Sequence, residues 1–179
     1  MDQLVAVWIL IVLALITANL PFVLERPLLA LPWAQHGEDR RPGWLRLLES
    51  LVFFVLLAGL LYAIVGWVGG SLVMASDAAS VGLFLFKIAV LAVAVVLLLS
   101  YPGWRDTNKS VHKSFFVRLL EVLALYALLG ALGFAFEINI GNFFAKDWEF
   151  YAITLSLYLV LGYPGFVYRY LMRHGRNRG

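Results

Sequence analysis

The sequence predicts an all-α polytopic membrane protein, a single membrane domain of residues 1–179 with five transmembrane helices. Three observations point to this fold. Apolar residues make up 63% of the chain and charged residues only 14%, which is more apolar surface than one globular core of this length buries. Five apolar stretches are each long enough to cross a hydrocarbon layer about 30 Å thick. Lys and Arg gather in alternate connections, a distribution typical of membrane proteins.

The first span is predicted at residues 4–24, a nearly continuous apolar run. Asp2 and the sequence Ala18-Asn19-Leu20-Pro21 do not supply the basic start and the small-residue cleavage site of a secretory signal peptide, so we expect a retained helix. Residues 25–44 contain prolines and a charged run, which together predict a loop. The middle of this loop, residues 27–33, is apolar enough to lie on the membrane surface.

The other four spans are predicted at residues 45–73, 81–100, 115–136 and 148–172. A short turn without Lys or Arg joins the second span to the third. The polar loop 101–114 joins the third to the fourth, and a short polar turn joins the fourth to the fifth. Two hydrophobic hairpins therefore follow the first span.

The positive side chains predict the orientation of the chain in the membrane. Around the first loop, around the third connection and in the tail there are four each: Arg26, Arg40, Arg41 and Arg46; Arg105, Lys109, Lys113 and Arg118; Arg169, Arg173, Arg176 and Arg178. The opposite connections hold only Lys146. Because Lys and Arg are enriched on the cytoplasmic side, we expect a periplasmic N-terminus, a cytoplasmic C-terminus and cytoplasmic loops at residues 25–44 and 101–114.

The two hairpins share sequence signals. Moving the first forward by 72 positions superposes Arg46-Leu47-Leu48-Glu49 on the identical Arg118-Leu119-Leu120-Glu121. Moving its end by 62 positions superposes Tyr101-Pro102-Gly103 on Tyr163-Pro164-Gly165. We interpret this as a tandem hairpin duplication in which both copies have the same orientation. Coincidence is the alternative, because leucine-rich helices match easily.

Each odd-numbered span approaches its cytoplasmic end at a proline: Pro21, Pro102 or Pro164. Proline lacks a backbone donor and clashes with the preceding turn, so we expect each to stop or kink its helix. In the fifth span the sequence Phe166-Val167-Tyr168 follows the proline and predicts a kinked continuation.

Lys87 is the candidate for chemistry inside the membrane, because it lies within the third span, where an unpaired charge is costly. Glu149 and Asp77 are its candidate partners in an intramembrane ion pair. Three interpretations stay open: a lysine that extends to the membrane surface, a structural ion pair with another chain, and a member of a proton or ion path.

The remaining acidic residues of the helices are interpreted as structural. Glu49 and Glu121 each follow an arginine by three residues, which predicts an i,i+3 pair at the membrane surface, with a functional carboxylate as the alternative. Glu137 is expected to pair with Lys146. Small residues one turn apart mark candidate helix-packing faces: Gly66 and Gly70 on the second span, Ala131 and Ala135 on the fourth.

The residue types exclude most kinds of site. The chain has no cysteine, which removes disulfides, thiolate nucleophiles and iron–sulfur clusters. Its histidines, His36, His112 and His174, fall in predicted cytoplasmic segments, which argues against a haem held inside the bundle. We therefore expect no catalytic residue, no metal site and no cofactor. The basic residues are clustered at the ends of the spans, a pattern that does not indicate binding of nucleic acid.

Four strings of residues resemble a family of small, uncharacterised bacterial inner-membrane proteins: Ala18-Asn19-Leu20-Pro21-Phe22, Val117-Arg118-Leu119-Leu120-Glu121, Trp148-Glu149-Phe150-Tyr151-Ala152, and Gly162 to Leu171. The string Pro164-Gly165-Phe166-Val167-Tyr168-Arg169-Tyr170 is the most specific. The resemblance covers about residues 1–24 and 113–173. The family has three spans, so hairpin 45–104 is interpreted as an insertion.

Members of that family are commonly encoded beside the last genes of the proton-pumping NADH:quinone oxidoreductase, respiratory complex I. The resemblance therefore implies a non-catalytic accessory subunit or assembly factor of complex I that contacts membrane subunits and phospholipid. The alternative is a small transporter or ion-conducting protein built from parallel hairpin repeats, with Lys87 and Glu149 at its centre. An integral-membrane enzyme is disfavoured, because the residues for a nucleophile or a metal are missing.

Overall fold

The computed structural model describes residues 3–35, 42–69, 78–105, 113–141 and 145–172. Within these residues the chain forms helices and connecting segments and no strand. Five of the described helical segments have the length and hydropathy to cross a membrane: Gln3–Val23, Gly43–Val68, Gly82–Arg105, Phe115–Ile140 and Trp148–Met172. The prediction of an all-α chain with five helices long and apolar enough to cross a membrane is confirmed for the described residues.

The first helix, α1 (Gln3–Val23), is followed by α2 (Gly43–Ala63), which continues through a π-helical turn, η1 (Ile64–Val68). Next come α3 (Ala78–Arg105) and α4 (Phe115–Ile140). The last span consists of α5 (Trp148–Leu161), α6 (Tyr163–Val167) and a second π-helical turn, η2 (Tyr168–Met172). The helices begin and end within a few residues of the predicted spans.

α3 differs most from its prediction, because it extends to Arg105 and not only to residue 100. Two side chains of its last turn hold a carboxylate on α2. Arg105 Nη1 lies 2.6 Å from Glu49 Oε1, and the Tyr101 hydroxyl donates to the same oxygen at 2.8 Å. These contacts stabilise a turn that the polar sequence had assigned to the loop.

Pro21 and Pro102 do not end their helices. α1 runs on to Val23 and α3 to Arg105, because a proline near a helix end removes one backbone hydrogen bond while its fixed φ stays helical. Pro164 behaves as predicted: the fifth span breaks between Leu161 and Tyr163, and the chain continues as α6.

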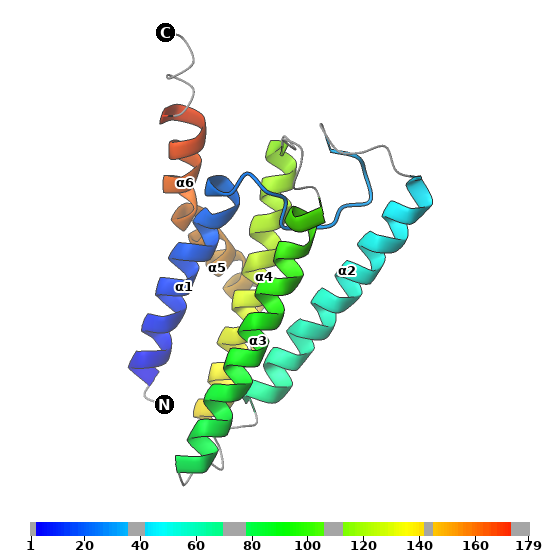
Figure 1. Cartoon of the computed structure of the whole chain (residues 1–179). Coiled ribbons are helices and arrows are strands. Elements are labelled where there is room, and N and C mark those ends of the chain that lie inside the picture. The colour runs from blue at the N-terminus through cyan, green and yellow to red at the C-terminus, as the bar shows by residue number, and fades with distance from the viewer. Residues whose placement is uncertain (1–2, 36–41, 70–77, 106–112, 142–144, 173–179) are drawn as a thin grey trace.

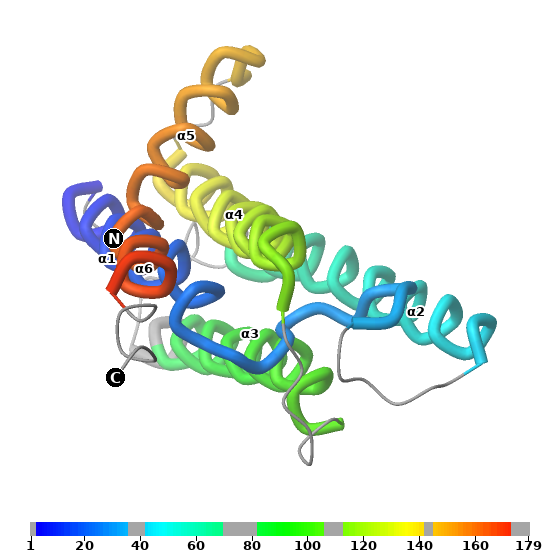
Figure 2. Tube along the Cα trace, turned by 90° about the horizontal axis from the view of Figure 1, so that it is seen from above, coloured from blue at the N-terminus to red at the C-terminus, as the bar shows by residue number. Residues whose placement is uncertain are grey.

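α4 is the central helix of the bundle (Figures 1 and 2). Among the 18 most apolar consecutive residues of each span, 33% are buried in α4, against 17–22% in the other four spans. Its buried residues recur every three or four positions, as in Glu121, Leu125, Leu128, Ala131 and Ala135. α1, α5 and α6 lie on one side of α4, and α2 and α3 lie on the other (Figure 2).

α1 and α3 end, and α2 and α4 begin, at the same end of the bundle, which we call the basic end (Figure 1). Residues 24–35 cross this end from α1 towards the start of α2 (Figure 1). Leu28, Leu29, Ala30 and Leu31 are buried there. This part of the loop therefore packs against the protein itself, while Trp33 at the end of the same apolar stretch is exposed.

α2 and α5 diverge from α4 (Figure 2). α2 stays close to α4 through η1, where Gly69 faces Ile138 of α4, and leans away towards the basic end. α5 joins α1 near the break at Gly162 and leans away towards the opposite end (Figure 2). Each divergent helix leaves much of its apolar surface outside the bundle.

Candidate functional site

Asn19 of α1 joins the first span to the break in the fifth. Its Nδ2 donates to the carbonyl of Leu161 at 2.8 Å and to the carbonyl of Leu15 in its own helix at 2.7 Å. Its Oδ1 accepts a hydrogen bond from the backbone N–H of Gly165 at 2.6 Å. In an unbroken helix the Gly165 N–H would donate to the Leu161 carbonyl. The side-chain amide of Asn19 thus satisfies both backbone groups that the break separates.

Two glycines allow this close approach. A Cβ at Gly162 would lie 3.0 Å from the carbonyl oxygen of Ala18, and a Cβ at Gly165 would lie 2.8 Å from Asn19 Oδ1. Any larger residue would push α1 and α6 apart. The sequence Gly162-Tyr163-Pro164-Gly165 therefore supplies both the break and the room for Asn19.

Arg118, in the first turn of α4, binds the end of α1. Its Nη1 donates to the carbonyl of Pro21 at 2.7 Å and to the carbonyl of Phe22 at 3.2 Å. These carbonyls belong to the last turn of α1, whose acceptors have no partner within the helix. A buried guanidinium at this position also complements the negative end of the helix dipole.

Glu121, one turn further along α4, binds the crossing segment. Its Oε1 accepts from the backbone N–H of Leu28 at 2.7 Å, and its Oε2 lies 2.7 Å from Nζ of Lys113. Both charged side chains have 0% exposure. Burial lowers the pKa of the Lys113 ammonium, and the charge of Glu121 opposes this shift. The pair is stable only because each charge has a partner.

We call Asn19, Lys113, Arg118 and Glu121, with the backbone groups that they bind, the polar joint. Aromatic rings surround it: Phe22 meets Phe166 edge to face at 6.0 Å between ring centroids, and Phe166 meets Tyr170 at 4.8 Å. Arg169 Nη1 and Glu25 Oε1, 2.8 Å apart, add a contact between η2 and the segment after α1. The joint fastens α1, α4, the fifth span and residues 24–35 together at the basic end.

The expectation for Glu121 was wrong in its details. The sequence predicted a surface pair with Arg118, whereas Glu121 is fully buried and pairs with Lys113. Its counterpart Glu49 lies near the surface and binds Arg105 and Tyr101. Asn19 and Lys113 were missed as site residues. A signal existed for Asn19, because it is a strong hydrogen-bonding group within an apolar span.

The predicted pair of Lys87 and Glu149 does not form. Lys87 is half-buried on α3, and Glu149 is exposed in the first turn of α5. In the described part of the chain α3 and α5 do not contact each other, and α4 lies between them (Figure 2). Asp77, the other candidate partner, lies outside the described residues.

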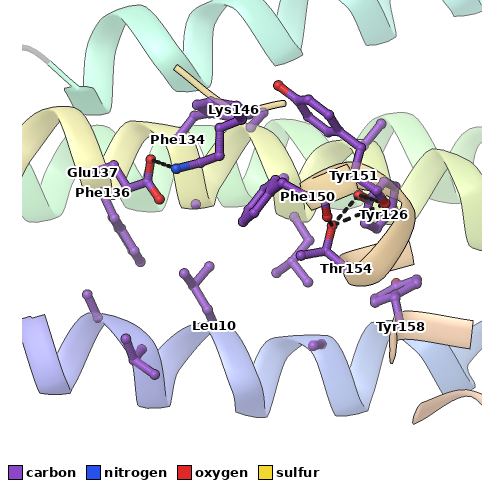
Figure 3. Close-up of a pocket in the computed structure, with 18 of the residues that line it drawn as sticks. Leu10, Tyr126, Phe134, Phe136, Glu137, Lys146, Phe150, Tyr151, Thr154 and Tyr158 are labelled. Carbon is purple, nitrogen blue, oxygen red and sulfur yellow. Dashed lines mark hydrogen bonds and ion pairs between the residues drawn. The ribbon is translucent and has the colours of Figure 1, made fainter. Parts of the chain in front are cut away.

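The predicted pair of Glu137 and Lys146 is confirmed. Lys146 Nζ lies 2.7 Å from Glu137 Oε2 and 4.8 Å from the ring centroid of Phe150 (Figure 3). This ion pair lies at the end of the bundle opposite the polar joint.

The candidate packing faces have different outcomes. Ala131 and Ala135 are buried on α4. Gly66 is exposed and a Cβ there would meet nothing within 4 Å, whereas a Cβ at Gly69 would lie 3.3 Å from Ile138 of α4. The π-helical turn at Ile64–Val68 adds a residue to the turn and so rotates Gly69 to the contact. Gly70 lies outside the described residues.

The four residues of the polar joint hold backbone groups and each other, and the chemistry of the joint is that of a structural clamp. Among the described residues, no group of three or more His, Asp or Glu side chains is placed to hold a metal ion. His36, His112 and His174 lie outside the described residues.

The chain matches a protein family described as protein of unknown function (DUF2818), over residues 6–105 and 104–173. The match includes every residue of the polar joint. It also runs through residues 45–104, which the resemblance in the sequence did not cover, and the interpretation of this hairpin as an insertion stays a prediction. No curated protein and no solved structure matches the chain.

Proposed function

We propose, from the premise that the chain belongs to the DUF2818 family of proteins of unknown function, that this protein is a non-catalytic component of a larger membrane complex. It packs against other membrane subunits as an accessory subunit or assembly factor. The complex is the proton-pumping NADH:quinone oxidoreductase, complex I, of the bacterial inner membrane, as the sequence resemblance implies.

The observation that carries this proposal is the divergence of α5 from its own bundle (Figure 2). Tyr158 is the only residue among Trp148–Leu161 that is buried, while Ile153, Leu159 and Val160 are exposed. Helices associate in membranes mainly through close packing, so a helix that leans away gives up contacts within its own chain. A neighbouring subunit that packs on α5 would restore them.

The location of the shared sequence supports a structural role. The strings that carry the family resemblance contribute Asn19, Arg118, Glu121 and Gly165, and these residues meet at the polar joint. The residues in these strings thus make contacts that fix the arrangement of the helices. A rigid scaffold with divergent helices suits a protein that docks onto others.

The proposed topology places the basic end in the cytoplasm. Basic residues of all three clusters, including Arg46, Arg105, Lys113 and Arg169, belong to helix ends or connections at this end (Figure 1). The enrichment of Lys and Arg on the cytoplasmic side favours this orientation. The hairpin duplication is supported by the family match, because its two stretches meet at residues 104–105, between the hairpins.

The transporter alternative depended on a centre formed by Lys87 and Glu149, and these residues lie on helices that do not meet. The substitution Lys87→Met removes this charge and separates the accessory proposal from the transporter alternative. On the accessory proposal, membranes that carry it oxidise NADH at the normal rate, whereas a loss of ion or substrate flux would favour the transporter.

Purification tests the main proposal. The full chain, tagged at its C-terminus and extracted in mild detergent, should bring down NADH-oxidising subunits. Val160→Phe enlarges an exposed side chain on α5 and should reduce this recovery several-fold. The matched variant Val93→Phe enlarges an exposed side chain on α3 and should leave the recovery unchanged. Recovery of the chain alone, or an equal effect of both variants, would contradict docking through α5.

A further inference from the structure

A groove opens between α1, α4 and α5 on the side of the bundle where α5 diverges, and Leu61, Tyr62 and Val65 at the end of α2 and in η1 also line it (Figure 3). Its volume is about 980 Å³, in the size range of about 300–1,000 Å³ that holds ligands in proteins. Its walls are apolar side chains such as Leu10 of α1, Phe136 of α4 and Leu157 of α5. Gly130 of α4 lines it, and a Cβ there would meet nothing within 4 Å.

The groove has two different ends. At the outer end, Lys146 and Glu137 form their ion pair beside Phe134 and Phe150 (Figure 3). At the inner end, the Tyr158 hydroxyl donates to Thr17 Oγ1 at 2.9 Å and so joins α5 to α1. Just beyond it, Gly162 packs on the carbonyl of Ala18. These contacts between α1 and the fifth span close the inner end of the groove.

The depth of the groove indicates which molecule it holds. On α4 the lining runs from Tyr126 to Ile140, and 14 helical residues at 1.5 Å each span about 21 Å, short of a hydrocarbon layer about 30 Å thick. A transmembrane helix of a partner needs a path through the whole layer. An acyl chain needs one leaflet only.

The charges at the outer end indicate the head group. The side chain of Lys146 is 11% exposed and that of Glu137 is 34% exposed, so the carboxylate is the more accessible partner. Together they carry no net charge, and a head group of net negative charge gains little from them. A zwitterionic head group matches them, with its phosphate at Lys146 and its ammonium at Glu137.

We propose that this groove is a binding site for one zwitterionic phospholipid, one of whose acyl chains fills the space over Gly130 and whose head group binds Lys146 and Glu137. The lipid belongs to the leaflet at the N-terminal end of α1. This proposal is independent of the proposed complex, because it concerns the isolated chain.

Native mass spectrometry of the full chain in mild detergent tests the proposal. The probes are phosphatidylethanolamine and phosphatidylglycerol with identical acyl chains. We expect one tightly retained phosphatidylethanolamine per chain and at least tenfold less retained phosphatidylglycerol. Glu137→Gln should bring the ratio of the two lipids close to one or below it, because it removes the carboxylate that binds the ammonium and leaves Lys146 for the phosphate that both lipids carry. Equal retention of both lipids by the unmodified chain would overturn the assignment of the head group.

Gly130→Leu places a side chain in the groove at a position where an added Cβ would meet nothing within 4 Å, and it should lower lipid retention at least tenfold. Gly59→Leu is the matched control, since Gly59 is exposed on α2 and a Cβ there also meets nothing within 4 Å. Should Gly130→Leu fail to fold, Ala127→Phe, at an exposed position that lines the same groove, replaces it. Unchanged lipid retention by a folded Gly130→Leu or Ala127→Phe protein would overturn the proposal. A dimer of the unmodified chain that the same substitution dissociates would also overturn it, because a second copy of the chain would then occupy the groove.

Discussion

Asn19 replaces, with one side chain, the backbone hydrogen bond that the fifth span gives up between Leu161 and Gly165. In the membrane no water can satisfy such groups, so a break in a helix needs a partner from the protein. Asn suits this task because its amide carries donors and an acceptor on a short side chain. The helix break is therefore specified jointly by residues far apart in the sequence.

Asn19→Leu should lower the free energy of unfolding by about 1–3 kcal/mol, because it leaves the Leu161 carbonyl and the Gly165 N–H without their partner. Unfolding of the purified chain in mixed micelles measures the change. Ser156→Ala is the matched control, since this hydroxyl bonds only to the carbonyl of Ala152 in its own helix, and it should have little effect. Equal stability of Asn19→Leu and the unmodified chain would show that the break needs no partner.

Lys113→Met should be more damaging, at about 3–5 kcal/mol, because it leaves the buried carboxylate of Glu121 without its cation. The double variant Lys113→Met with Glu121→Gln removes both charges and should recover most of this loss. A double-mutant cycle measured by unfolding in micelles gives the coupling energy. Additive losses in the double variant would mean that the two side chains do not act as a pair.

At the scale of the elements, irregular helices determine which faces meet. The π-helical turn of α2 brings Gly69 to α4, and Asn139 of α4 donates to the carbonyl of Val68 at the end of that turn. The break at Gly162 likewise brings the fifth span against α1. Both irregularities have a glycine where the backbones approach and an asparagine from the neighbouring helix.

Gly165→Ala tests whether the close contact between α1 and α6 is required. The new Cβ would lie 2.8 Å from Asn19 Oδ1, so we expect overpacking to cost about 1–3 kcal/mol of stability. Gly59→Ala places the same methyl group in open space on α2 and should be neutral or stabilising, because Ala favours helix. Thermal unfolding compares them. A stable Gly165→Ala protein would mean that α6 moves away from α1 freely.

The sequence predicted the number of long apolar helices, because hydrophobic length is a local property, but it ended the third of them five residues too early. It predicted the pair of Glu137 and Lys146 for the same reason, since only a short turn separates them. It could not predict that Asn19 binds Gly165, because these residues are 146 positions apart and no periodic pattern indicates which backbone group an amide will reach. It also missed the burial of Glu121, since the crossing segment that covers it folds back from residues 24–35.

At the scale of the whole molecule, the two ends of the bundle differ in kind. The basic end is fastened by the polar joint and by the ion pair of Arg105 and Glu49. Towards the opposite end, α5 leaves the bundle and the groove opens (Figures 2 and 3). We expect contacts with lipid and with partner subunits to concentrate where the chain packs least on itself.

The orientation of these two ends is open to a direct test, because the chain has no cysteine and single cysteines can be introduced without background. Ser110→Cys lies in the connection between α3 and α4, and Ser76→Cys lies in the connection between α2 and α3. If the basic end is cytoplasmic, a membrane-impermeant maleimide added to intact spheroplasts labels Ser76→Cys and leaves Ser110→Cys unlabelled until the membrane is permeabilised. The physical reason is that transfer of the connection that holds Arg105, Lys109 and Lys113 across the membrane would oppose the charge bias that orients spans during insertion.

The reverse labelling pattern would place the polar joint outside the cell and the phospholipid groove in the cytoplasmic leaflet. Labelling of both positions from the same side would mean that α3 does not cross the membrane.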